Sequence, residues 1–128
     1  MTVMIVDDSA EMRRLLSDMV SPLSKAVVEC ADGQECLERF EACQPEWTIM
    51  DVQMPRLDGL EAARAVHERW PAAKVVMVTH FFSPAIEAAA DAAGAVGCVS
   101  KDDLYRLLEF MGTLPVDPAT PAPQAPAR

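Results

Sequence analysis

The chain has 128 residues, of which 51% are hydrophobic and 24% are charged, and it carries a formal net charge of −9. This length and apolar content favour one domain with one core, and the acidic surplus argues against nucleic acid or an anionic membrane as the direct partner, because both attract basic surfaces. A zinc site is also disfavoured, because the four cysteines include no C-x-x-C pair and there are only two histidines.

The start of the chain, MTVMIVDDS, lacks the basic segment and the long apolar stretch of a signal peptide. No uncharged apolar run reaches the roughly 18 residues that a membrane span needs. The cysteines are interpreted as reduced and mostly buried thiols. Together these features predict a cytoplasmic protein.

Short apolar runs alternate with helical patterns along most of the chain. Strands are predicted at residues 3–6, 26–28, 47–50, 74–79 and 96–100. After each strand the apolar positions recur at intervals of three and four, which indicates one face of a helix. These helices are predicted at about 9–20, from 32, from 58, at 83–93 and at 104–111.

Several helix starts carry capping signals. Asp32 and Asp58 each precede a glutamate by three residues, Glu35 and Glu61 respectively, which is the spacing of a capping box. Ser83 is followed directly by a proline, the residue favoured at the first helical position. The helices are therefore predicted to begin soon after the strands end.

The order of elements is strand then helix, five times over. Strands that are apolar on both faces and joined by helices indicate a parallel sheet covered on both sides. The predicted fold is α/β, a flavodoxin-like doubly wound sheet of five parallel strands in the order 2-1-3-4-5. This domain is expected to span residues 1–112. The remainder, 113–128, contains five prolines and is predicted to be a Pro/Ala-rich disordered tail.

Polar side chains stand at the carboxyl ends of the predicted strands. Asp7 and Asp8 follow the first strand and Asp51 follows the third, while Thr79 ends the fourth and Lys101 follows the fifth. Ligand sites of open α/β sheets lie beyond these ends, where the strand order reverses. Because the first and third strands are neighbours at that reversal, the three carboxylates are expected to converge there.

Three acids in one cleft repel one another, by roughly 3 kcal/mol for two unit charges about 5 Å apart at an effective dielectric of about 20. A divalent cation removes this conflict, and carboxylates without histidine or cysteine partners select hard ions such as Mg²⁺. Any one of these acids is equally well explained as a turn or cap residue. Combined with a hydroxyl and an ammonium, they suit phosphoryl chemistry, with a carboxylate as the candidate nucleophile.

These residues carry a resemblance to a known family. The segments IVDDS, DVQMPRLDG, VVMVT and GAVGCVSK occur in the order and spacing of the receiver domain of two-component response regulators. The resemblance spans about residues 1–112 and is to a stand-alone receiver. It implies a phosphoacceptor domain of a phosphorelay that receives its phosphoryl group from a histidine kinase or a phosphotransfer protein.

The resemblance also implies a role for each matching residue. Asp51 would accept the phosphoryl group, and Thr79 and Lys101 would contact the phosphoryl oxygens. Mg²⁺ would be held by Asp51 together with the two acids after the first strand, Asp7 and Asp8.

The remaining ligand of the Mg²⁺ ion would be the backbone carbonyl of Gln53. The domain would signal through contacts with a downstream protein, as a monomer or weak dimer, without touching nucleic acid or a membrane. It would not be an enzyme beyond Mg²⁺-dependent self-phosphorylation and autodephosphorylation.

Three positions depart from the family pattern. Cys98 stands where the family usually has tyrosine or phenylalanine, His80 where it has a small residue, and Asp102 where many members have proline. The small thiol of Cys98 predicts weak coupling between the site and the last helix. The segment SKDD is more similar to receivers joined to LuxR-type helix-turn-helix domains, although only the proline-rich tail follows here.

Several functions therefore stay open on the sequence alone. The complete set of matching side chains favours a phosphorylated receiver. The atypical residues keep open a receiver-like interaction module with weakened phosphorylation switching, and SKDD keeps open the receiver half of a DNA-binding regulator that lacks its output domain. A hydrolase of the haloacid dehalogenase type is disfavoured, because Gln53 stands where that class has a second aspartate.

Overall fold

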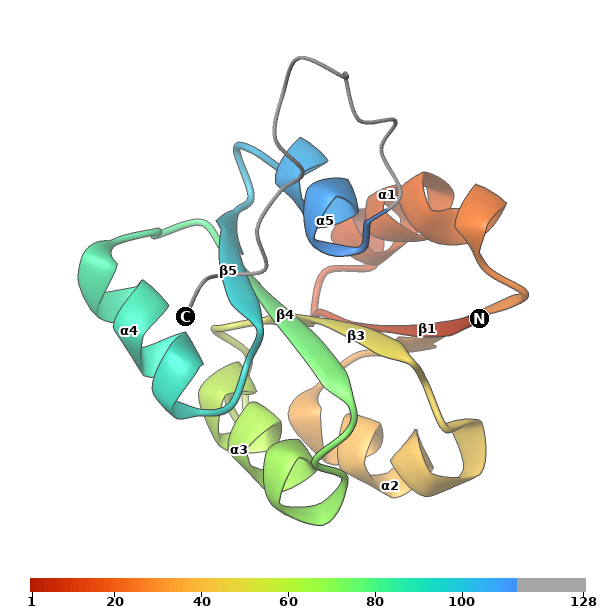
Figure 1. Cartoon of the computed structure of the whole chain (residues 1–128), viewed down its shortest axis with the longest axis horizontal. Coiled ribbons are helices and arrows are strands. Elements are labelled where there is room, and N and C mark those ends of the chain that lie inside the picture. Colours follow the sequence, from red (N-terminus) through yellow and green to blue (C-terminus); the bar gives the residue numbers. More distant parts are fainter. Residues whose placement is uncertain (113–128) are drawn as a thin grey trace.

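Five parallel strands form one sheet at the centre of the computed structural model, which describes residues 1–112 (Figure 1). The strands are β1 (Thr2–Val6), β2 (Ala26–Cys30), β3 (Trp47–Asp51), β4 (Lys74–Thr79) and β5 (Gly97–Ser100). Their order is β2-β1-β3-β4-β5, which confirms the predicted doubly wound topology. The predicted tail at 113–128 lies outside the described residues.

Helices cover both faces of this sheet (Figure 1). They are α1 (Ala10–Val20), α2 (Gly33–Cys43), α3 (Gly59–Arg69), α4 (Pro84–Ala92) and α5 (Tyr105–Phe110). α1 and α5 lie on one face, and α2, α3 and α4 lie on the other. A short 3₁₀ helix, Ser21–Leu23, extends α1 and was not predicted. No helix in the described part of the chain is long and apolar enough to cross a membrane.

The predicted caps begin the helices. The side chains of Asp32 and Asp58 accept the backbone N–H three residues ahead, and Ser83 does the same for α4. Each such cap stabilises a helix by about 1 kcal/mol. The capping box of α2 differs in one contact, because the Glu35 carboxylate accepts the N–H of Ala31 at 2.7 Å instead of the N–H of the cap residue. The caps set how soon each helix starts after its strand.

Buried side chains fill both interfaces between the sheet and its helices. Toward α2, α3 and α4 the sheet presents Met4, Met50 and Met77, and toward α1 and α5 it presents Ile5, Ile49 and Val76. All six are 0% exposed. Because β1, β3 and β4 are packed on both faces, their carboxyl ends are held firmly relative to one another.

Candidate functional site

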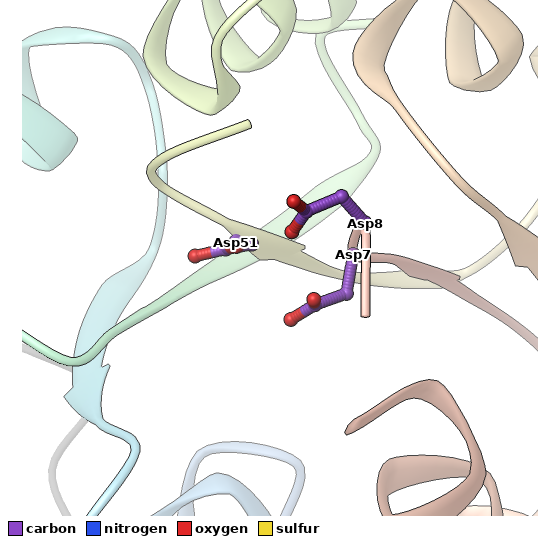
Figure 2. Close-up of side chains that lie close together, drawn as sticks. All are labelled: Asp7, Asp8 and Asp51. Atoms are coloured by element: carbon purple, nitrogen blue, oxygen red, sulfur yellow. The ribbon is translucent and has the colours of Figure 1, made fainter. Parts of the chain in front are cut away.

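Three carboxylates converge where the strand order reverses, as predicted. Asp7 and Asp8 follow β1, and Asp51 is the last residue of the neighbouring β3 (Figure 2). One oxygen from each lies within 4.8 Å of the others. Asp7 and Asp51 are 0% and 5% exposed, whereas Asp8 is exposed to solvent. Two buried acids at this separation require positive charge nearby.

Lys101 supplies part of that charge from the end of β5. Its Nζ lies 2.9 Å from Asp7 Oδ2 and 3.3 Å from Asp51 Oδ2, and its side chain is 4% exposed. One ammonium facing three carboxylates leaves the cluster with excess negative charge. Carboxylate oxygens with excess negative charge fit a hard divalent cation.

Thr79 brings a hydroxyl to the same edge of the sheet. The residue is fully buried at the end of β4, and its Oγ1 accepts a hydrogen bond from the N–H of Phe81 at 3.0 Å. Its carbonyl accepts the N–H of Lys101 at 2.8 Å. A hydroxyl that accepts one hydrogen bond still has its own proton to donate, so Thr79 can serve an anionic oxygen.

The loop after Asp51, residues 52–58, continues the site and is called the 52–58 loop below. The N–H of Gln53 donates to Asp51 Oδ1 at 3.3 Å, and the predicted role of the Gln53 carbonyl as a metal ligand stays a prediction. Where the loop ends, the N–H of Gly59 donates to the carbonyl of Val52 at 2.9 Å. A Cβ at Gly59 would lie 1.9 Å from the backbone oxygen of Asp51, so α3 starts directly against the acid-bearing residue.

Sequence reasoning missed Arg13 of α1. Its guanidinium donates to the backbone carbonyl of Asp7 at 2.7 Å and lies 3.3 Å from Glu29 Oε1. The Arg13 side chain therefore fixes the backbone of Asp7. Arginine is mostly a surface residue in folded proteins, so the sequence contains no signal that singles Arg13 out.

The atypical residues lie in two different environments. Cys98 is buried at 2% exposure on the α2–α3–α4 face, where burial and the charge of Glu87 raise its pKa to about 11. It behaves as a small core residue, and the predicted weak coupling stays a prediction. His80 is exposed and lines a surface hollow together with Met12 and Leu15 of α1.

The electrostatics of the cluster act most strongly on Asp51. Burial raises the pKa of its carboxyl above the usual range, and the negative charge of Asp7 raises it further. The nearby Lys101 lowers it again but offsets only part of this effect. The folded protein therefore holds a proton on Asp51 more tightly than the unfolded chain does, and ionised Asp51 opposes folding.

Replacing Asp51 with asparagine is accordingly expected to raise the melting temperature in a metal-free buffer at neutral pH. Because the pKa is higher in the folded state, the free energy of unfolding falls as pH rises from the unfolded pKa to the folded one. The carboxamide does not ionise, so the gain should be largest at neutral pH and should shrink at about pH 4, the ordinary range for aspartate. Thermal unfolding in the presence of a chelator measures the melting temperatures of both proteins at neutral pH and at about pH 4.

Asp58→Asn is the matched control, because it removes an acid from the same loop while keeping a side chain that caps helices well. Its melting temperature should change little between the two pH values relative to the native chain. A lower melting temperature for Asp51→Asn than for the native protein at neutral pH would contradict the electrostatic account.

The chain is similar to several known proteins. The family model described as response regulator receiver domain matches residues 3–111. The chemotaxis protein CheY of Thermotoga maritima is 31% identical over 100 residues, which cover 77% of this chain and 83% of that protein. The response regulator domain of Thermotoga maritima CheB, a solved structure, superposes with a TM-score of 0.77 at 30% identity, covering 92% of this chain and 98% of that one.

Longer proteins also match. The protein-glutamate methylesterase/protein-glutamine glutaminase of Symbiobacterium thermophilum is 41% identical over 103 residues, which cover 77% of this chain but 28% of that protein. The chain thus spans about a quarter of the length of the methylesterases that it matches.

Proposed function

This chain belongs to the response regulator receiver domain family, and we propose that it accepts a phosphoryl group on Asp51 with the help of Mg²⁺. One observation carries the proposal: the buried Asp51 at the tip of β3 lies with Asp7 and Asp8 in one acidic cluster, with Lys101 Nζ 3.3 Å from its carboxylate. Receiver domains are signalling modules, so the esterase activity named for the longer relatives is not assigned to this chain.

The donor set fits the metal. Receiver domains bind Mg²⁺ at an acidic cluster, and here Asp7, Asp8 and Asp51 would hold it together with the carbonyl of Gln53. All of these ligands are oxygens, which is the preference of Mg²⁺. When bound, the ion neutralises negative charge on the transferred phosphoryl oxygens.

The chain's own residues perform the rest of the transfer. An oxygen of Asp51 forms a bond to phosphorus while the bond between phosphorus and the donor breaks, and the donor leaves with that electron pair. Lys101 contacts the Asp51 carboxylate, which supports a role for its ammonium in pairing with a phosphoryl oxygen. In this proposal the hydroxyl of Thr79 donates its proton in a hydrogen bond to another phosphoryl oxygen.

The proposed partners follow from this chemistry. The donor is a histidine kinase or a phosphotransfer protein, and the output is a contact with a downstream protein. A monomeric or weakly dimeric state and a cytoplasmic location stay predictions. The family match gives no support to a hydrolase of the haloacid dehalogenase type. It also does not favour an interaction module with weakened phosphorylation switching or a DNA-binding regulator that lacks its output domain.

The test is the intact mass of the native chain after treatment with acetyl phosphate, with and without Mg²⁺. We expect one phosphoryl group per chain when Mg²⁺ is present and little or none in chelator. Absence of label in both conditions, in protein shown to be folded, would overturn the proposal.

His80 is expected to prolong the life of the phosphoryl group. Its exposed imidazole follows Thr79 directly in the chain, and it would crowd the approach of water to the phosphoryl group or donate a hydrogen bond to it. In His80→Ala the group should be lost several-fold faster, measured by intact mass after the donor is removed.

The matched control for this experiment is His67→Ala, which removes the other histidine from the last turn of α3. Its hydrolysis rate should equal that of the native chain. A rate in His80→Ala that is equal to or slower than the native rate would count against a protective role.

A further inference from the structure

The 52–58 loop is tied to the start of α2 by two contacts outside the acidic cluster. The guanidinium of Arg56 is paired with the carboxylate of Asp32. The next residue, Leu57, places its carbonyl oxygen 2.8 Å from where a Cβ on Gly33 would lie. Asp32 follows β2 and Arg56 follows β3, and β1 lies between these two strands in the sheet. The pair of side chains therefore passes the end of β1, where Asp8 lies.

The Arg56 bridge contributes little to stability. Arg56 has a φ of 67°, a left-handed conformation that is unfavourable for a residue with a Cβ. Its side chain is 70% exposed, and exposed ion pairs stabilise a fold only weakly. The unfavourable backbone conformation and the weak ion pair therefore act in opposite directions on stability. The main effect of the contact between Arg56 and Asp32 is therefore on the geometry of the 52–58 loop.

Asp32 is the fixed end of the bridge. One carboxylate oxygen accepts the N–H of Glu35 at 2.9 Å and caps α2, and the other faces Arg56. Its side chain is 10% exposed, far less than that of its partner. A carboxylate that is held by a helix start can fix the exposed guanidinium. The pKa of Asp32 is lowered by the cap hydrogen bond first and by Arg56 second.

The loop that Arg56 holds is the one that completes the cation site. Both of its ends are pinned by backbone hydrogen bonds, Val52 N–H to the Val78 carbonyl at 2.9 Å and Gly59 N–H to the Val52 carbonyl at 2.9 Å. Gln53, the predicted carbonyl ligand, lies between these pinned ends and is exposed. The bridge anchors the middle of the same segment.

We propose that Arg56, held by Asp32, is a positioning residue that pre-forms the cation site by fixing the 52–58 loop. The inference rests on the proposed function, because it concerns affinity for Mg²⁺ at the same cluster. A positioning role and simple electrostatics predict opposite changes in Mg²⁺ affinity when Arg56 is removed. Removing a positive charge near an acidic cluster should by charge alone strengthen cation binding, whereas loss of the positioned loop should weaken it.

The test is calorimetric Mg²⁺ titration of native protein and Arg56→Gly. Glycine adopts a positive φ without strain, so this variant should fold with a melting temperature close to native. We expect its Mg²⁺ affinity to fall several-fold, with Arg56→Lys in between. Faster hydrogen exchange at the amides of Gln53 and Met54 in metal-free Arg56→Gly gives a second readout that does not depend on the ion.

Two further variants complete the design. Asp32→Asn keeps a good cap on α2 and weakens only the bridge, and its double variant with Arg56→Gly should bind Mg²⁺ no more weakly than the weaker single. Arg39→Ala, which removes an exposed ion-paired arginine from α2, is the matched control and should bind as native.

Native-like or tighter Mg²⁺ binding by Arg56→Gly overturns the positioning role. That result differs from failure of the proposed function, in which the native chain itself binds no Mg²⁺ and takes no phosphoryl group.

Discussion

Replacing Asp51 with asparagine is expected to abolish phosphoryl transfer from acetyl phosphate or phosphoramidate to the chain. The carboxamide keeps the size and the place of the side chain at the tip of β3, but its oxygen is not an anionic nucleophile. Labelling, followed by intact mass in the presence of Mg²⁺, should drop from one group per chain to none. Undiminished labelling of Asp51→Asn would mean that another residue accepts the phosphoryl group.

Two further substitutions show that such a loss is specific to the nucleophile. Asp58→Asn removes an acid from the same loop and keeps the cap of α3, so it should label as the native chain does. Asp8→Asn keeps the nucleophile and removes one predicted metal ligand. Its labelling should be slow at a Mg²⁺ concentration that saturates the native chain, and it should recover as more Mg²⁺ is added.

Replacing Gly59 with alanine is expected to destabilise the fold by at least about 2 kcal/mol. The added Cβ would lie 1.9 Å from the backbone oxygen of Asp51 and 3.0 Å from Cε of Met77. The methionine end can shift, but the backbone of a fully packed strand cannot. On helix propensity alone alanine would be favoured by about 1 kcal/mol, so the clash reverses the sign of the effect.

Denaturant unfolding measures the loss, and Mg²⁺ titration of the folded fraction shows whether Asp51 has been displaced. Gly112→Ala is the control: an added Cβ there meets nothing within 4 Å in the described part of the chain, and its φ of 68° predicts a cost of only about 1 kcal/mol or slightly more. Native-like stability of Gly59→Ala would show that α3 can retreat from β3 without cost.

Much of the fold was predictable because its signals are local. Apolar runs and intervals of three and four residues depend on neighbours along the chain, and they located every strand and every α-helix within residues 1–112. The capping aspartates and serine set the starts of three helices. β2 extends to Cys30, past its predicted end, because pairing with β1 continues where the apolar pattern stops.

The main residues of the site were predictable for a related reason. In a parallel sheet the carboxyl ends of all strands lie at one edge, so Asp7, Asp51 and Thr79 could be placed together once each was recognised as a polar residue that ends a strand or directly follows one. The order of the strands decided which of them are neighbours, and here β1 and β3 pair directly.

By itself, then, the sequence determined the alternation of elements, the polar residues at the strand ends and the family resemblance that joins them. Only the tertiary structure decided the lateral contacts. Lys101 reaches Asp7 across 94 positions of sequence, and Arg56 reaches Asp32 across 24. An exposed arginine in a loop belongs to no hydrophobic pattern and does not follow a strand directly, so the sequence does not identify it as part of the site. Its role becomes visible only when folding brings two separate loops together, because contacts between distant segments leave no local pattern in the chain.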